Sequence, residues 1–85
     1  MNLEKFVHRG NAAQAAVNRI IDDVHAVNNW NERYDIGTPV NVKLDDGSIK
    51  ETRTCSVAWM LGGHTAVIML EGISGGYSLR RVTAK

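Results

Sequence analysis

The chain has 85 residues, of which 44% are hydrophobic and 22% are charged. This length fits one domain, whose small core leaves only a few kcal/mol of stability. Its 10 Lys and Arg residues nearly balance 9 Asp and Glu residues, which gives a formal net charge of +1. The balance argues against a generic binder of polyanions and leaves only a local basic patch open.

The sequence contains one cysteine, Cys55, and three histidines. One cysteine excludes an intrachain disulfide, and so few scattered ligands predict no structural zinc and no other cofactor. There is no apolar stretch of about 18 residues and no basic-then-apolar start, so we expect neither membrane contact nor a signal peptide. A free thiol without an export signal predicts the reducing cytoplasm. Association is then the remaining device by which so small a domain gains stability.

Residues 3–28 carry the pattern of a long helix. Asn2 suits the N-cap, and Asn28-Asn29 suit the C-terminal end. The pair Gly10-Asn11 consists of poor helix formers, so an interruption of the helix there stays open. Apolar or small residues recur every three or four positions: Leu3, Phe6, Gly10, Ala13, Val17, Ile20, Val24 and Val27.

The steps of this stripe alternate between three and four, which is the spacing of a coiled-coil heptad. A helix of 26 residues is about 39 Å long, which exceeds the packing face of a β domain of about 55 residues. One interpretation is a single helix packed on its own sheet. The favoured one is association with a partner helix, as a homodimer, through Phe6, Ala13, Val17, Ile20 and Val24.

After the helix, which we assign to residues 1–29, residues 30–85 change to a period of two. Val40, Val42 and Leu44 alternate with polar residues, and Asp45-Asp46-Gly47-Ser48 predicts a hairpin turn. Further β-type runs are expected at 49–57, 65–70 and 77–79, with a helical turn or a last strand at 80–83. The run 66–70 is apolar on both faces, so it predicts a central strand covered by the β domain on one side and by the helix on the other.

Together these elements predict an α+β fold. It has one long N-terminal helix followed by a small SH3-like antiparallel β-barrel or curled sheet of 4–5 short strands. A flat antiparallel sheet backed by the helix is the alternative.

Two stretches of the chain carry a resemblance. One is Arg9-Gly10-Asn11-Ala12-Ala13-Gln14-Ala15-Ala16-Val17, and the other includes Leu61-Gly62-Gly63-His64-Thr65-Ala66-Val67 and Gly72-Ile73-Ser74-Gly75-Gly76-Tyr77. They resemble a group of small uncharacterised proteins of bacteriophages and prophages. The resemblance implies an N-terminal helix, a small SH3-like β domain, and a phage product that acts in the cytoplasm of the bacterial host. It implies no enzymatic activity and no catalytic residues.

The candidate chemistry of single residues is sparse. Cys55 and His64 lack the orienting group and oxyanion site that a catalytic pair needs. The Gly62-Gly63 segment leads into a strand rather than a helix, which favours a turn over a phosphate loop. We expect Trp59 in the core, Trp30 where the helix meets the β domain, and Tyr77 as an exposed contact. The candidates for contact with a nucleic acid or a partner are Lys50, Arg53, His64, Tyr77, Arg80 and Arg81.

The leading hypothesis is a non-enzymatic phage or prophage accessory protein that acts through protein–protein contacts. One alternative is a nucleic-acid-binding module that uses a basic and aromatic face of the β domain. Another is an inhibitor of a host enzyme or defence complex, with a host bacterial protein as its partner.

Overall fold

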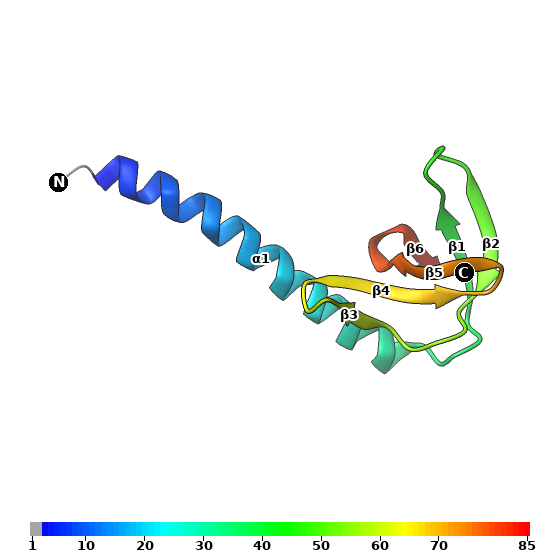
Figure 1. Ribbon diagram of the computed structural model, residues 1–85. Helices are drawn as coiled ribbons and strands as arrows, with labels where there is room; N and C mark the ends of the chain where they lie inside the picture. Colours follow the sequence, from blue (N-terminus) through cyan, green and yellow to red (C-terminus); the bar gives the residue numbers. More distant parts are fainter. Residues whose placement is uncertain (1–2) are drawn as a thin grey trace.

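The computed structural model describes the backbone of residues 3–85 and the side chains of residues 14–85. The helix α1 (Leu3–Arg33) precedes a β region of six short strands (Figure 1). The strands are β1 (Pro39–Lys43), β2 (Ile49–Arg53), β3 (Trp59–Leu61), β4 (Thr65–Leu70), β5 (Ile73–Ser78) and β6 (Val82–Ala84), with a 3₁₀ turn η1 (Leu79–Arg81) before β6. The predicted α+β class is confirmed.

The helix α1 is the longest element, and its backbone continues through Gly10. At 31 residues it is about 46 Å long. It ends at Arg33 rather than at Asn28-Asn29, because the helical residues that follow this pair pack on the β region and form hydrogen bonds to it. Trp30 is buried, and the side-chain amide of Asn31 donates to the carbonyl of Ala58 at 3.0 Å and accepts from its N–H at 2.9 Å. The predicted change from the helical period to a period of two, at residue 30, thus lies inside the helix.

The β region consists of two antiparallel sheets of three strands, in the orders β2-β1-β6 and β3-β4-β5. An isolated bridge between Thr54 and Leu70 joins them where the chain passes from β2 toward β3. The prediction of an SH3-like barrel with 4–5 strands was therefore wrong in two respects. The structure has six strands, and the described strands form no closed barrel. Apart from the bridge between Thr54 and Leu70, no described strand of one sheet pairs with a strand of the other, so no continuous ladder surrounds the core.

The hairpin turn predicted at Asp45-Asp46-Gly47-Ser48 is confirmed. Leu44 donates its N–H to the carbonyl of Ser48 at 2.8 Å, and Gly47 has a φ of +87°. The carboxylate of Asp46 accepts from the N–H of Ser48 at 2.9 Å and from its hydroxyl at 2.6 Å. A glycine with positive φ and an acidic residue that closes its own turn explain why this sequence reverses the chain here.

The pattern of apolar residues missed β3 and indicated only the end of β5, at 77–79. β3 holds only three residues, and β5 contains Gly75 and Gly76, a residue type that weakens a strand. β5 forms because β4 offers it a ladder, in which Met69 stands opposite Gly76 and Ile68 opposite Tyr77. The segment after β5 supplies both of the expected elements, the 3₁₀ turn η1 and the strand β6.

The core lies between α1 and the two sheets. Its buried members come from every layer: Val27 and Trp30 from α1, Val40 and Val42 from β1, Ala66, Ile68 and Leu70 from β4, and Leu79 and Val82 after β5, with Ala58. Trp30 is therefore found where it was expected.

The two faces of β4 have different covers from those predicted. Because side chains alternate along a strand, Ala66, Ile68 and Leu70 share one face, and they join one core with residues of both α1 and the other sheet. Val67 points to the opposite face, where Trp59 stands across from it in β3. The helix thus does not cover the second face of β4. Trp59 is half-buried on the outer face of the sheet and is not a member of the main core.

Candidate functional site

Among the described side chains of α1, those of residues 14–33, the large apolar ones that are exposed form a stripe. We call it the α1 stripe and define it as Val17, Ile20, Ile21 and Val24. These side chains are 48%, 37%, 44% and 38% exposed. Successive residues turn by about 100° around a helix axis, so the four lie on one side of α1. Phe6 and Ala13, the other members of the predicted association face, lie outside the described side chains.

The stripe stays exposed mainly because α1 packs on its own β region only near its C-terminal end, so that Val27 is buried whereas Ile20, one heptad earlier on the same side, is 37% exposed. Asp23, Val27 and Trp30 are buried there, at the spacing of one helical face. The earlier part of α1 projects past the strands (Figure 1). The Cα radius of gyration is 16.2 Å, against about 12 Å for a compact chain of this length. The long dimension of the molecule, 55 Å, follows the helix.

Asp23 fixes α1 against the sheet at the point where the helix leaves it. Its carboxylate accepts the N–H of Ala66 at 3.0 Å, the Arg80 Nε–H at 2.9 Å, and an ion pair with Arg80 Nη2 at 2.8 Å. The hydrogen bond from Ala66, aided by Arg80, lowers the pKa of Asp23 against the opposing effect of burial. The sequence does not show which groups Asp23 contacts, only its place on the helix. Its signal was the step from Asp23 to Val27 and Trp30, which places a carboxylate on the packing face.

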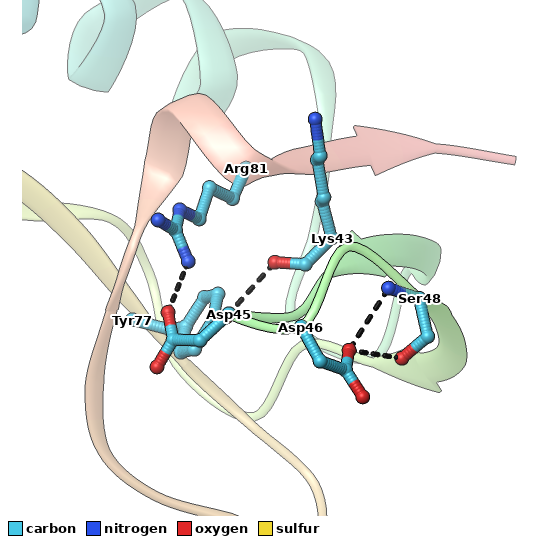
Figure 2. A network of polar contacts seen from close by, with 6 residues as sticks. All are labelled: Lys43, Asp45, Asp46, Ser48, Tyr77 and Arg81. Atoms are coloured by element: carbon cyan, nitrogen blue, oxygen red, sulfur yellow. Dashed lines mark hydrogen bonds and ion pairs between the residues drawn. The ribbon is translucent and has the colours of Figure 1, made fainter.

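A second polar network ties the β1–β2 turn to the end of β5 (Figure 2). The hydroxyl of Tyr77 donates to the carbonyl of Lys43 at 2.9 Å, and Arg81 forms an ion pair with Asp45. The Tyr77 hydroxyl and the Asp45 carboxylate raise the pKa of the Arg81 guanidinium further. Tyr77 also packs on the core. The expectation of Tyr77 as an exposed contact is thus replaced by a structural role for its hydroxyl.

The six candidates for nucleic-acid or partner contact do not form one patch. Arg80 is held by Asp23, and Arg81 by Asp45. Lys50 and Arg53 line a separate groove of about 450 Å³, together with Glu51, Glu71 and Lys85. Lys85 is paired with Glu51 at 3.0 Å, so acidic and basic groups alternate in that groove.

His64 stands in the β3–β4 turn, where its Nδ1 lies 3.0 Å from the hydroxyl of Thr65. Cys55 is exposed rather than buried. Across the side chains of residues 14–85, no hydrogen bond joins Cys55 to His64. In the same part of the chain, no three His, Cys, Asp or Glu residues gather as a metal ion would require.

No helix in the described part of the chain combines the length and the apolar character needed to cross a membrane. No protein-family model matches the chain, no curated protein matches its sequence, and no solved structure matches its fold.

Proposed function

We propose that this protein is a non-enzymatic interaction module that associates with a second copy of itself through the α1 stripe. The observation that carries the proposal is the exposure of Val17, Ile20, Ile21 and Val24 on a helix that projects beyond its own domain. A monomer leaves this apolar face in water, and a second identical face covers it in the simplest symmetric way.

The apolar surface that a dimer would bury determines the free energy of association to expect. Burying a large aliphatic side chain completely yields about 1.5–3 kcal/mol, so side chains that are about 40% exposed have about 0.6–1.2 kcal/mol each still to gain. Four such residues on each of two copies gain about 5–10 kcal/mol, against an association cost of about 4–15 kcal/mol. These gains and costs are similar, so the dimer should depend on protein concentration and on single residues of the stripe.

The polar neighbours of the stripe permit such a symmetric contact. On one flank stand Gln14, Asn18 and Asn28, all exposed and uncharged. The side-chain amide of Gln14 donates to Asn18 at 2.9 Å along the helix. Within residues 14–28 this flank also carries His25 but no Asp, Glu, Lys or Arg, so identical copies bring none of these charged side chains together there. Repulsion between like charges is what would oppose self-pairing.

The resemblance to phage and prophage proteins supports an accessory role in the cytoplasm of a bacterial host. A host protein is then a further possible partner of the same face. No structural observation favours the nucleic-acid alternative, since Arg80 and Arg81 are already paired with carboxylates.

Sedimentation velocity across low and high micromolar concentrations tests the proposal. The wild type should pass from monomer to dimer, and Ile20→Asp should remain monomeric. The matched control is Ala15→Asp, which places the same charge on an exposed position of α1 outside the stripe. A wild-type monomer throughout, or equal dimerisation of the two variants, would contradict it.

A further inference from the structure

A groove of about 290 Å³ runs between the C-terminal end of α1 and β6. One wall is aromatic: Trp30 and Tyr34 both line it, with ring centroids 4.5 Å apart and planes tilted by 50°. The floor comes from Leu79 and Val82, which belong to the core. This volume accommodates one large side chain and part of the backbone that carries it, at the small end of ligand pockets.

The strand at the groove is the edge of its sheet. In the order β2-β1-β6, β6 pairs with β1 on one side, and no described strand pairs with its other side. Val82, Thr83 and Ala84 all line the groove. Neighbouring side chains of a strand point to opposite faces, so a groove that touches three in a row runs along the strand's edge. An edge of this kind offers backbone N–H and C=O groups to a further strand.

The charge in the groove has one sign. Arg33 is the only charged residue among those that line it, and within residues 14–85 it forms no ion pair. The C-terminal end of a helix carries a partial charge of about −0.5, which leaves a net positive field near Arg33. Glu32 lies on another side of α1, because one residue turns the helix by about 100°.

We propose that this groove binds an extended peptide segment of a partner protein. The segment adds to β6 as a further antiparallel or parallel strand and inserts one apolar side chain between Trp30 and Leu79. An acidic side chain two positions along the segment, and therefore on the same face of the added strand, pairs with Arg33. The three features of the groove match the three parts of such a ligand: an open strand edge, an aromatic and aliphatic pocket, and one cation.

This site is separate from the α1 stripe. Ala26, Asn29 and Arg33 reach the groove from one side of α1, whereas Ile20, Ile21 and Val24 lie nearly opposite on the helix. A dimer formed through the stripe would leave both grooves open. The peptide site therefore does not depend on the proposed self-association.

The test uses five acetylated and amidated hexapeptides of sequence TVXVET, in which X is Leu, Ile, Phe, Tyr or Trp. Each is titrated to about 1 mM into the full-length protein labelled with ¹⁵N, and amide shifts are followed by NMR. At least one peptide should saturably shift the amides of residues 82–84 and the indole N–H of Trp30. Replacing Glu by Gln in that peptide, or Arg33→Gln in the protein, should weaken binding about fivefold, as expected for an exposed ion pair.

Arg19→Gln is the matched control, because it removes an exposed arginine of the same helix outside the groove and should leave the affinity unchanged. A copy of the peptide that is N-methylated at alternate amides should lose binding, since it cannot complete the ladder with β6. The proposal is overturned if none of the five peptides shifts these signals. It is also overturned if the shifts map to another surface, if Arg33→Gln has no effect, or if hexanoate alone reproduces the same shifts.

Discussion

The carboxylate of Asp23 accepts the backbone N–H of Ala66 at 3.0 Å, across 43 positions of sequence. The same carboxylate holds Arg80, so one buried side chain joins α1, β4 and the segment after β5. Buried polar groups are costly unless they are paired, and the carboxylate of Asp23 supplies an acceptor for the N–H of buried Ala66. This contact lies where α1 leaves the β region, so it sets the direction in which the rest of the helix projects.

Removing this carboxylate should cost more than any other change to the acidic residues of the chain. For Asp23→Ala we expect the free energy of unfolding to fall by about 1.5–3 kcal/mol, because the N–H of Ala66 loses a charged acceptor. Asp22→Ala, at the exposed neighbouring position, should change it by less than about 0.5 kcal/mol. Urea titrations followed by tryptophan fluorescence compare the two. Equal effects would show that Asp23 does not anchor the helix.

The same contact makes stability depend on acid pH. The pKa of Asp23 in the folded protein lies below its ordinary value of 3.8. Above that value the carboxylate is ionised in both the folded and the unfolded states, and its contribution is complete. As the pH falls below about 4, the unfolded state binds the proton first and the contribution is lost. The stability gap between wild type and Asp23→Ala, measured by urea unfolding, should therefore narrow below about pH 4. A gap that stays constant would contradict this assignment.

The outer face of the β3-β4-β5 sheet requires a glycine at position 76. A Cβ there would lie 3.1 Å from Val67 Cγ2 and 3.3 Å from Trp59 Cζ2, closer than ordinary van der Waals contact. Gly76→Ala should thus lower the free energy of unfolding by about 1 kcal/mol, through displacement of the Trp59 ring. Ser74→Ala, on an exposed residue of the same strand, is the control. Thermal unfolding distinguishes them, and an unchanged Tm for Gly76→Ala would refute the close contact.

The hydroxyl of Tyr77 should contribute measurably to the joining of the two sheets. Tyr77→Phe keeps the ring in the core and removes the hydrogen bond to the carbonyl of Lys43, so we expect a loss of about 0.5–1.5 kcal/mol. Asp45 is almost fully exposed, so Asp45→Ala should cost less than about 0.5 kcal/mol although it breaks the ion pair with Arg81. Chemical denaturation of both variants tests this order, and the reverse order would contradict it.

The elements with a strong periodic pattern could be predicted from the sequence, and the shorter ones could not. The helix pattern placed α1, and the alternation at Val40 and Val42 placed β1 beside a confirmed turn. β3 had no such signal and β5 had one only at its end, 77–79, because both form through pairing with β4 rather than through their own residues. The glycines of β5 indicated a loop by propensity, whereas Gly76 is in fact the position that lets Trp59 lie over the strand.

The candidate site, too, could be predicted from the sequence only where its residues follow a periodic pattern. The heptad pattern placed Val17, Ile20 and Val24 on one face of the helix, where they are exposed, and their part in association stays a prediction. The partners of single charges depend on residues that are distant in sequence, so the pairing of Arg80 with Asp23 could not be read from either residue. The groove at β6 was missed because it exists only where the end of α1 meets the edge of a sheet.

Hydrogen exchange tests the central claim, the role of the α1 stripe, most directly. The projecting part of α1 has little tertiary cover in one chain, and an isolated helix of this kind is marginal in water. We predict that amide protection of residues 14–24 rises strongly between low and high micromolar protein, while protection of β4 stays constant. The same measurement on Ile20→Asp should show no rise. Protection of residues 14–24 that does not depend on protein concentration in the wild type would contradict self-association through this face.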